Sequence, residues 1–178
     1  MHLIFLYGPP AVGKLTIAQI LQKKLDYKLL HNHLLIKVFD SIFDFYDPVR
    51  KILTREFRMR LVEEAINNDI DLIITSGSAG SPTLFEYYTE LINLIRDRGG
   101  ELSMVQLTAD SQTLLSRVDD KFRKDHGKEF GKKELKKILS QPKFVFDKYP
   151  DVDHLTINTA QVSAEDAAFM IINYYHLK

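Results

Sequence analysis

The sequence predicts an α/β protein in which helices cover both faces of a parallel β-sheet. Short, almost continuously apolar runs alternate along the chain with longer segments whose apolar residues recur every three or four positions. This alternation is typical of parallel sheets with crossover helices. The length of 178 residues fits one domain. We therefore expect a single three-layer α/β/α domain over residues 1–178.

Five short runs are the expected strands of this sheet. They cover residues 3–7, 27–31, 71–77, 101–110 and 154–159. A parallel sheet is buried on both faces, which explains why the runs are nearly all apolar and do not alternate with polar residues. The first run stops at Gly8, and the third closes with Gly77.

The segments between the strands carry helical signals. Leu15, Ala18, Leu21 and Leu25 fall on one face of a helix that begins near Lys14. A second helical segment contains residues 55–68. The other helices are marked at their ends, by terminating glycines or by N-cap side chains. These signals are Gly99 and Gly100 after residues 84–98, Asp110 or Ser111 before the next helix, and Ser163 with Asp166 before the last one.

Composition excludes several classes of function. The 24 basic and 24 acidic residues give no net charge, which argues against a general binder of nucleic acid or membrane surfaces. There is no cysteine, so disulfides, thiolate catalysis and cysteine-ligated zinc are excluded. No signal peptide or membrane-spanning run is expected. We expect a cytoplasmic protein, either a monomer or a homodimer.

The segment GPPAVGKLT, residues 8–16, has the spacing of a phosphate-binding loop. Such a loop needs glycines where the backbone turns tightly, a helix that begins at once, and a lysine that reaches the β and γ phosphates. Gly8, Gly13 and Lys14 meet these needs. The hydroxyl that normally follows the lysine arrives one position late, at Thr16. Chance is the alternative, and the strand before the loop and the helix after it argue against chance.

The same segment resembles the adenylate kinase loop, G-x-P-G-x-G-K-G-T. Pro10, Gly13, Lys14 and Thr16 match it, whereas Ala11 and Leu15 stand where the pattern has glycine. Over most of its length the chain resembles the P-loop kinases of small molecules, which include adenylate kinase and shikimate kinase. The resemblance implies strand order 2-3-1-4-5, ATP with Mg²⁺ as cofactors, and Thr16 as the side chain near the metal. The residues implied to contact the nucleotide are Gly8, Pro9, Pro10, Ala11, Val12, Gly13, Lys14, Leu15 and Thr16.

A basic segment follows the fourth strand. Residues 121–148 hold ten basic and four acidic side chains, a net charge of +6 in a neutral protein. In the related kinases a mobile lid lies here, and we expect residues 117–148 to form it and to close over the triphosphate. The resemblance places Arg117 where an arginine stacks on adenine and makes Arg123 the lid arginine. A solvated basic helix is the alternative, and it fits Lys136 and Lys137.

The acceptor side departs from the related kinases. Shikimate-kinase-like proteins carry Asp-x-Asp at the end of strand 2, where this chain has His31, Asn32 and His33. The pair of histidines can contact an acceptor, transfer a proton near neutral pH, bind a metal, or serve only in structural hydrogen bonds. His33 stands in place of the second aspartate. Arg58, in the Phe-Arg pair before strand 3, matches an arginine that binds an acidic acceptor, although a surface salt bridge is also open.

Together these features predict an ATP-dependent phosphotransferase. It would move the γ-phosphoryl group to a small hydroxylated or acidic metabolite, with Lys14, Arg123 and His33 as the catalytic residues. The alternative is an ATP-binding regulatory module or slow NTPase without a small-molecule acceptor, which the missing strand-2 carboxylates favour. The expected partner is a small molecule, with no nucleic acid and no membrane.

Overall fold

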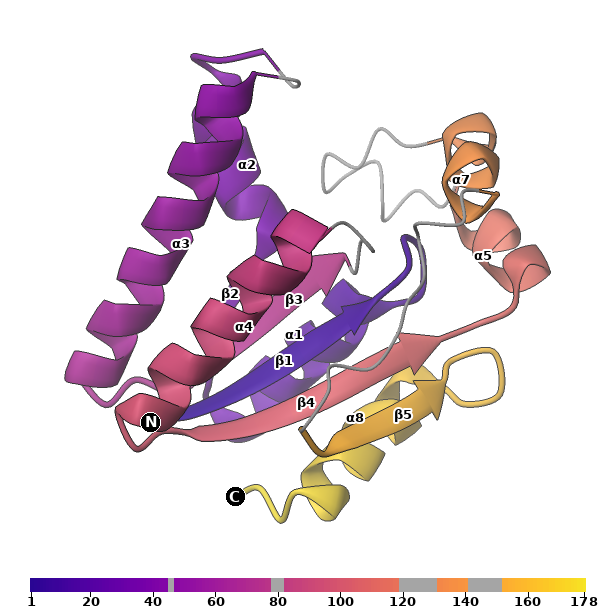
Figure 1. Ribbon diagram of the computed structural model, residues 1–178. Coiled ribbons are helices and arrows are strands. Elements are labelled where there is room, and N and C mark those ends of the chain that lie inside the picture. Colours follow the sequence, from indigo (N-terminus) through magenta and orange to yellow (C-terminus); the bar gives the residue numbers. More distant parts are fainter. Residues whose placement is uncertain (45–46, 78–81, 119–130, 141–151) are drawn as a thin grey trace.

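Five parallel strands form the central sheet of the computed structural model, which describes residues 1–44, 47–77, 82–118, 131–140 and 152–178. The strands lie in the order β2-β3-β1-β4-β5, so the predicted order is confirmed (Figure 1). Their bounds are β1 His2–Gly8, β2 Lys28–His31, β3 Leu72–Gly77, β4 Glu101–Thr108 and β5 His154–Asn158.

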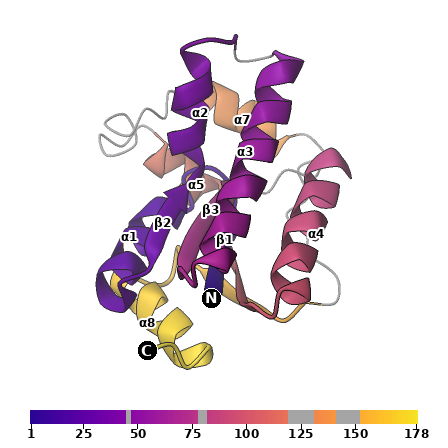
Figure 2. The same cartoon turned by 90° about the vertical axis from the view of Figure 1, so that its left-hand side faces the viewer.

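Helices cover both faces of the sheet, as the sequence predicted (Figure 2). Among the described residues, no helix combines the length and the apolar character needed to cross a bilayer. The helices are α1 Lys14–Leu25, α2 Asn32–Asp40, α3 Pro48–Asn67, α4 Pro82–Asp97, α5 Ser111–Arg117, α7 Lys132–Leu139 and α8 Ala164–Tyr174.

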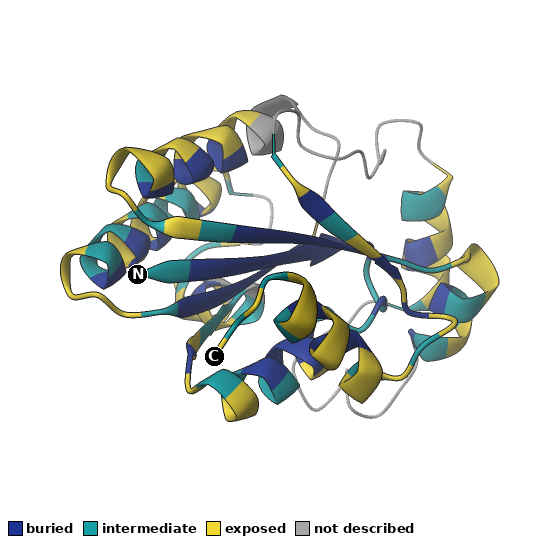
Figure 3. Cartoon of the chain, turned by 90° about the horizontal axis from the view of Figure 1, so that it is seen from below, coloured by how far each residue is buried: buried dark blue, intermediate teal, exposed yellow. Residues whose placement is uncertain are grey.

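Two hydrophobic cores lie on opposite faces of β1, the middle strand. Ile4 and Leu6 pack into a core with side chains of α1, α5, α7 and α8. Leu3, Phe5 and Tyr7 pack into the other core, against α3 and α4. Successive side chains of a strand point to opposite faces, so a continuously apolar strand fills both cores at once. Figure 3 shows the buried strands between the helical layers.

The helix ends follow their sequence signals. The Asp110 side chain accepts from the Thr113 backbone N–H at 2.8 Å, which makes Asp110, not Ser111, the N-cap of α5. Ser163 accepts from the Asp166 N–H at 3.1 Å, as the capping pattern predicted. Gly99, beyond the end of α4, has a φ of 69°. This left-handed conformation is one that glycine adopts at little cost.

Helix α2 was not foreseen in the sequence. Its N-cap is His31, whose side chain makes no capping hydrogen bond, so the usual signal for a helix start is missing. Helix α3, which includes most of the expected segment 55–68, begins at Pro48. Asp47 caps it by accepting from the Val49 N–H at 2.8 Å, and Pro48 occupies its first turn. Proline at that position costs the helix no hydrogen bond.

Candidate active site

The loop between β1 and α1 turns through three residues with positive φ. Gly8 has a φ of 151°, Ala11 of 66° and Gly13 of 98°. A Cβ atom at Gly8 would lie 2.3 Å from the carbonyl oxygen of Leu107 in β4, so only glycine allows the two strands this approach. The loop follows the carboxyl end of β1 (Figure 1), the edge where open α/β sheets bind ligands.

The first turn of α1 is open to an anion. Gly13 is the N-cap and offers no side-chain hydrogen bond, so the first backbone N–H groups of the helix have no side-chain cap. These groups and the positive end of the helix form a favourable site for phosphate. Leu15 is only 3% exposed, so its bulk points into the core. Thr16 is exposed, which leaves its hydroxyl available beside the first turn.

Lys14 lies across the loop that it follows. Its Nζ donates to the carbonyl oxygens of Gly8 and Pro9, both at 2.7 Å. An ammonium group has three donors and no acceptor, so these bonds hold a positive charge over the loop backbone. A phosphate held at the start of α1 would meet that charge.

Three residues of the loop have no backbone N–H free for a phosphate, namely Pro9, Pro10 and Val12. The prolines have no N–H, and the buried Val12 donates its N–H to the Pro9 carbonyl at 3.4 Å. We therefore expect any N–H contacts to phosphate to come from Ala11 and from the residues after Val12. Contact of residues 8–16 with the nucleotide stays a prediction.

Arg117, the last residue of α5, is fixed to the segment after β5. Its Nη1 donates to Thr159 Oγ1 at 3.1 Å and its Nη2 to the Thr159 carbonyl oxygen at 2.8 Å. The Thr159 hydroxyl in turn donates to the carbonyl oxygen of Val12 at 3.0 Å. A short chain of hydrogen bonds therefore connects Arg117 with the loop between β1 and α1.

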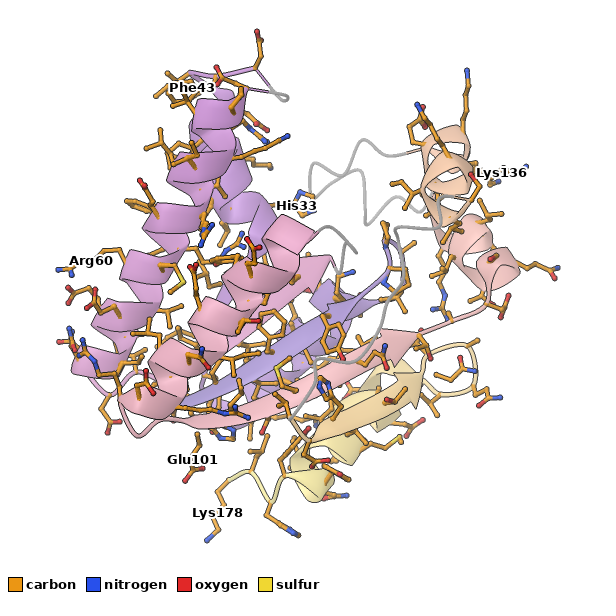
Figure 4. All side chains as sticks on the ribbon, viewed as in Figure 1. His33, Phe43, Arg60, Glu101, Lys136 and Lys178 are labelled. Carbon is orange, nitrogen blue, oxygen red and sulfur yellow. The ribbon has the colours of Figure 1, made fainter. Side chains whose placement is uncertain are left out.

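The histidine pair lies where β2 passes into α2. His31 ends the strand, and Asn32 and His33 open the helix. The rings of His31 and His33 lie 6.5 Å apart, centroid to centroid. His33 projects from the start of α2 toward the side of the molecule that carries α5 and α7 (Figure 4). The part of the chain that the structure describes holds no cluster of three His, Cys, Asp or Glu side chains fit to bind a metal.

Arg58 is buried between α3 and α4, with 5% of its surface exposed. Its guanidinium carbon lies 5.7 Å from the ring centroid of Tyr87. Arg55 lies at 5.6 Å from the same ring and pairs with Glu90. Burial raises the pKa of Tyr87 to about 12, against the opposing effect of Arg58. Burial of Arg58 argues against the exposed surface salt bridge that the sequence left open. Its contact with an acceptor stays a prediction.

Only part of the expected lid belongs to the described residues. Arg123 lies outside them, so its position stays a prediction, as does the extent 117–148. Within this segment, α7 packs against the core through Leu135, which is fully buried. Lys136 and Lys137 are exposed, in agreement with a solvated basic helix, and Figure 4 shows Lys136 at the molecular surface.

Three residues of this region were missed in the sequence. Leu107 and Thr159 touch the loop through a backbone carbonyl and a hydroxyl, and Tyr87 contacts Arg58. Thr159 ends the run HLTINT, which predicts only a strand. Its position directly after a strand, at the edge that also carries Gly8, is the signal that would have found it.

The architecture is shared with solved kinase structures. A sugar kinase from Janibacter is 12% identical, with a TM-score of 0.69, over 99% of this chain and 95% of that one. A gluconokinase from Sinorhizobium meliloti is 15% identical, with a TM-score of 0.63, over 98% and 93%. A shikimate kinase from Acinetobacter baumannii is 22% identical, with a TM-score of 0.61, over 99% and 93%.

The chain has the fold of the P-loop small-molecule kinases. The predicted resemblance is confirmed at the level of the fold, and each alignment covers nearly the whole of both chains. No protein-family model and no curated protein matches the sequence. At identities this low the likeness concerns architecture, and fold alone does not fix chemistry.

Proposed function

We propose that this protein is an ATP-dependent phosphotransferase that acts on a small hydroxylated or acidic metabolite. The observation that carries the proposal is the loop 8–13 with Lys14. It combines positive-φ turns, an uncapped helix start and an ammonium group held over the loop. This arrangement suits a polyphosphate. Its occurrence in the fold of sugar, gluconate and shikimate kinases supports phosphoryl transfer as its use.

The residues around the loop fit ATP with Mg²⁺. Lys14 would neutralise the β and γ phosphate oxygens, and the N–H groups at the start of α1 would bind them. Mg²⁺ prefers oxygen ligands and keeps several waters, so the exposed Thr16 hydroxyl, the phosphates and water suffice to hold it. When bound, the metal neutralises charge on the phosphates. Arg117 would present a face of its guanidinium to adenine.

On the acceptor side, His33 would orient the acceptor hydroxyl or take its proton, with His31 and Asn32 lining the same edge. Arg58 would bind an anionic group of the acceptor. Arg123 would approach from the lid and offset the charge of the transferred group. Phosphoryl transfer depends mainly on positioning and electrostatics, so an imidazole in place of a carboxylate is compatible with turnover.

A second candidate is an ATP-binding regulatory module or slow NTPase. The observation that favours it is the sequence His31-Asn32-His33, which stands where shikimate-kinase-like proteins carry Asp-x-Asp. Without those carboxylates the chain can hold a nucleotide and yet lack the groups that activate an acceptor.

The deciding experiment is ADP production from ATP and Mg²⁺ across a panel of hydroxylated acids, sugars, nucleosides and aminoglycosides. An acceptor that stimulates ADP release supports the kinase. Tight ATP binding with a flat panel supports the regulatory module. Absence of both binding and turnover would overturn the two candidates together.

Two lysine variants serve as the test and the control in this assay. Lys14→Ala should lower acceptor-dependent turnover by about 100-fold or more, because it removes the charge aimed at the transferred phosphate. Lys23→Ala removes the same charge from the exposed far end of α1 and should leave turnover within about twofold. Equal activity of Lys14→Ala and the wild type would contradict the assignment.

A further inference from the structure

Thr159 is a buried polar residue at the meeting point of several segments. It is 6% exposed and follows directly after β5. Its backbone N–H donates to the carbonyl oxygen of Thr108, at the end of β4, at 2.8 Å. Its hydroxyl donates to the Val12 carbonyl oxygen at 3.0 Å, with the Thr108 carbonyl oxygen at 3.3 Å as a second acceptor within reach. Both donors of Thr159, its backbone N–H and its hydroxyl, are therefore engaged.

The two remaining acceptors of Thr159 both take hydrogen bonds from Arg117. One guanidinium nitrogen donates to the hydroxyl at 3.1 Å and another to the carbonyl oxygen at 2.8 Å. Hydrogen bonds of a guanidinium lie in its plane. These two bonds therefore fix the plane of the Arg117 guanidinium. They do not involve its two faces, which are the surfaces that can stack on an aromatic base.

The loop to which the Thr159 hydroxyl donates is also held in place. Val12 is fully buried, and Gly8 packs against the Leu107 carbonyl oxygen so closely that no Cβ fits between them. The loop is therefore attached to the ends of β4 and β5 at two points, and one of them is the Thr159 hydroxyl. The Thr159 hydroxyl bonds both to the loop and to the Arg117 guanidinium, and the Thr159 carbonyl oxygen adds a second bond to Arg117.

We propose that Thr159 is a positioning residue for nucleotide binding, which holds the Arg117 guanidinium at a fixed place relative to the phosphate-binding loop. This inference rests on the proposed function, since it concerns the same nucleotide site. A ligand that engages Arg117 and the loop together, a purine nucleoside triphosphate, then gains affinity from the link. A ligand that engages the loop alone does not.

The test compares Mg²⁺-ATP with inorganic tripolyphosphate, which has the phosphates and no base. Thr159→Val keeps the shape of the side chain and removes the hydroxyl. We expect it to raise the Kd for ATP about tenfold and to change the Kd for tripolyphosphate by less than about threefold. Thr159→Ser, which keeps the hydroxyl, should bind ATP within about twofold of wild type. The control is Thr156→Val, whose exposed hydroxyl bonds to Gln106 in the sheet and which should leave both constants unchanged.

A double-mutant cycle tests whether Thr159 acts through Arg117. In an Arg117→Ala background, Thr159→Val should weaken ATP binding by less than about threefold further, because the group that it positions is gone. If the Kd for ATP of the double variant rises by the product of the two single effects, the proposal is overturned. Equal weakening of ATP and tripolyphosphate by Thr159→Val would also overturn it, because that pattern indicates a distorted loop.

Arg117→Lys keeps the proposal falsifiable if Thr159→Val does not fold. Lysine retains the charge and loses the planar fork, so we expect about tenfold weaker ATP binding with tripolyphosphate binding unchanged. ATP binding within twofold of wild type would contradict the positioning role. A wild-type protein that binds neither ATP nor tripolyphosphate would overturn the proposed function itself, and this outcome is distinct from a failure of the Thr159 variants alone.

Discussion

Ala11 adopts a left-handed backbone conformation, with a φ of 66°, inside the loop between β1 and α1. The Cβ of an L-residue is strained there by about 1–2 kcal/mol, and glycine is not. The adenylate kinase pattern has glycine at this position, so this chain tolerates a strain that the pattern avoids. Neighbouring contacts, such as the Gly8 approach to Leu107, hold the loop in this shape.

The first residue-scale prediction is that Ala11→Gly stabilises the protein. The free energy of unfolding should rise by about 0.5–1 kcal/mol in urea denaturation, because relief of the strain exceeds the added entropy of the unfolded chain. The control is Ala164→Gly in the first turn of α8, which should lower stability, because a helix disfavours glycine. A loss of stability in both variants would show that Ala11 is not strained.

The second residue-scale prediction concerns pH and His2. Burial lowers the pKa of His2 from its usual 6.5, and its ring nitrogens contact Ser103 at 2.8 Å and Tyr27 at 3.2 Å. Above pH 6.5 both the folded and the unfolded states hold this ring neutral. As pH falls below 6.5 the unfolded state takes up the proton first, so stability decreases until the pH passes below the folded pKa.

Urea denaturation at pH 7.5 and 5.5 checks this sign. The wild type should lose more unfolding free energy between the two values than His2→Gln does, because glutamine does not titrate. An identical loss in both proteins would mean that His2 makes no contribution to the pH dependence.

At the scale of elements, α7 shows how a basic segment is held. Leu135 is fully buried in the core on the α1–α8 face of the sheet, while Lys136 and Lys137 face outward. The helix therefore combines an anchored apolar edge with an exposed cationic one. Helix α7 also contacts α5.

Leu135→Ala tests the anchor. We expect it to lower the free energy of unfolding by about 2 kcal/mol or more, because truncation of a fully buried leucine removes apolar contact and leaves a cavity. The matched control Lys136→Ala alters an exposed residue of the same helix and should stay within about 0.5 kcal/mol. If Leu135→Ala has no effect on stability, α7 is not packed against the core in solution.

At the scale of the whole molecule, the site lies where neighbouring parallel strands end together. Gly8 pairs in register with Gly77 across β1 and β3, and β4 lies on the other side of β1. The loop after β1 is thus enclosed by its two neighbours. Any side chain at Gly8 must push against the backbone of β4.

Gly8→Ala should destabilise the protein by on the order of 2–3 kcal/mol and disrupt ATP binding, because its Cβ would overlap the Leu107 carbonyl. Gly77→Ala is the control at the paired position, since a Cβ there meets nothing within 4 Å. Thermal and urea denaturation of the two variants provide the comparison. Equal stability of both would contradict the tight approach of β4 to the loop.

The sequence alone predicted the five strands and most of the helices between them, because strands that are buried on both faces of a parallel sheet consist of short apolar runs. It also predicted a phosphate-binding role for Lys14 and Gly13, since a phosphate-binding loop needs specific residues at consecutive positions. It missed α2, whose N-cap carries no capping signal. The strand order came from the likeness of the loop to known kinases and was then confirmed by the tertiary structure.

Only the tertiary structure brought together residues that the chain separates widely. Thr159 bonds to Val12, which lies 147 positions away in the sequence. Leu107 lies against Gly8 through its backbone carbonyl, a group that every residue type carries, so the sequence cannot indicate this contact. The side chain of Leu15 points into the core, and only the packing of α1 against the sheet shows this direction. Local patterns record which residues are apolar or turn tightly. Contacts between strand ends depend on how the strands assemble into the sheet, and local sequence patterns do not specify that assembly.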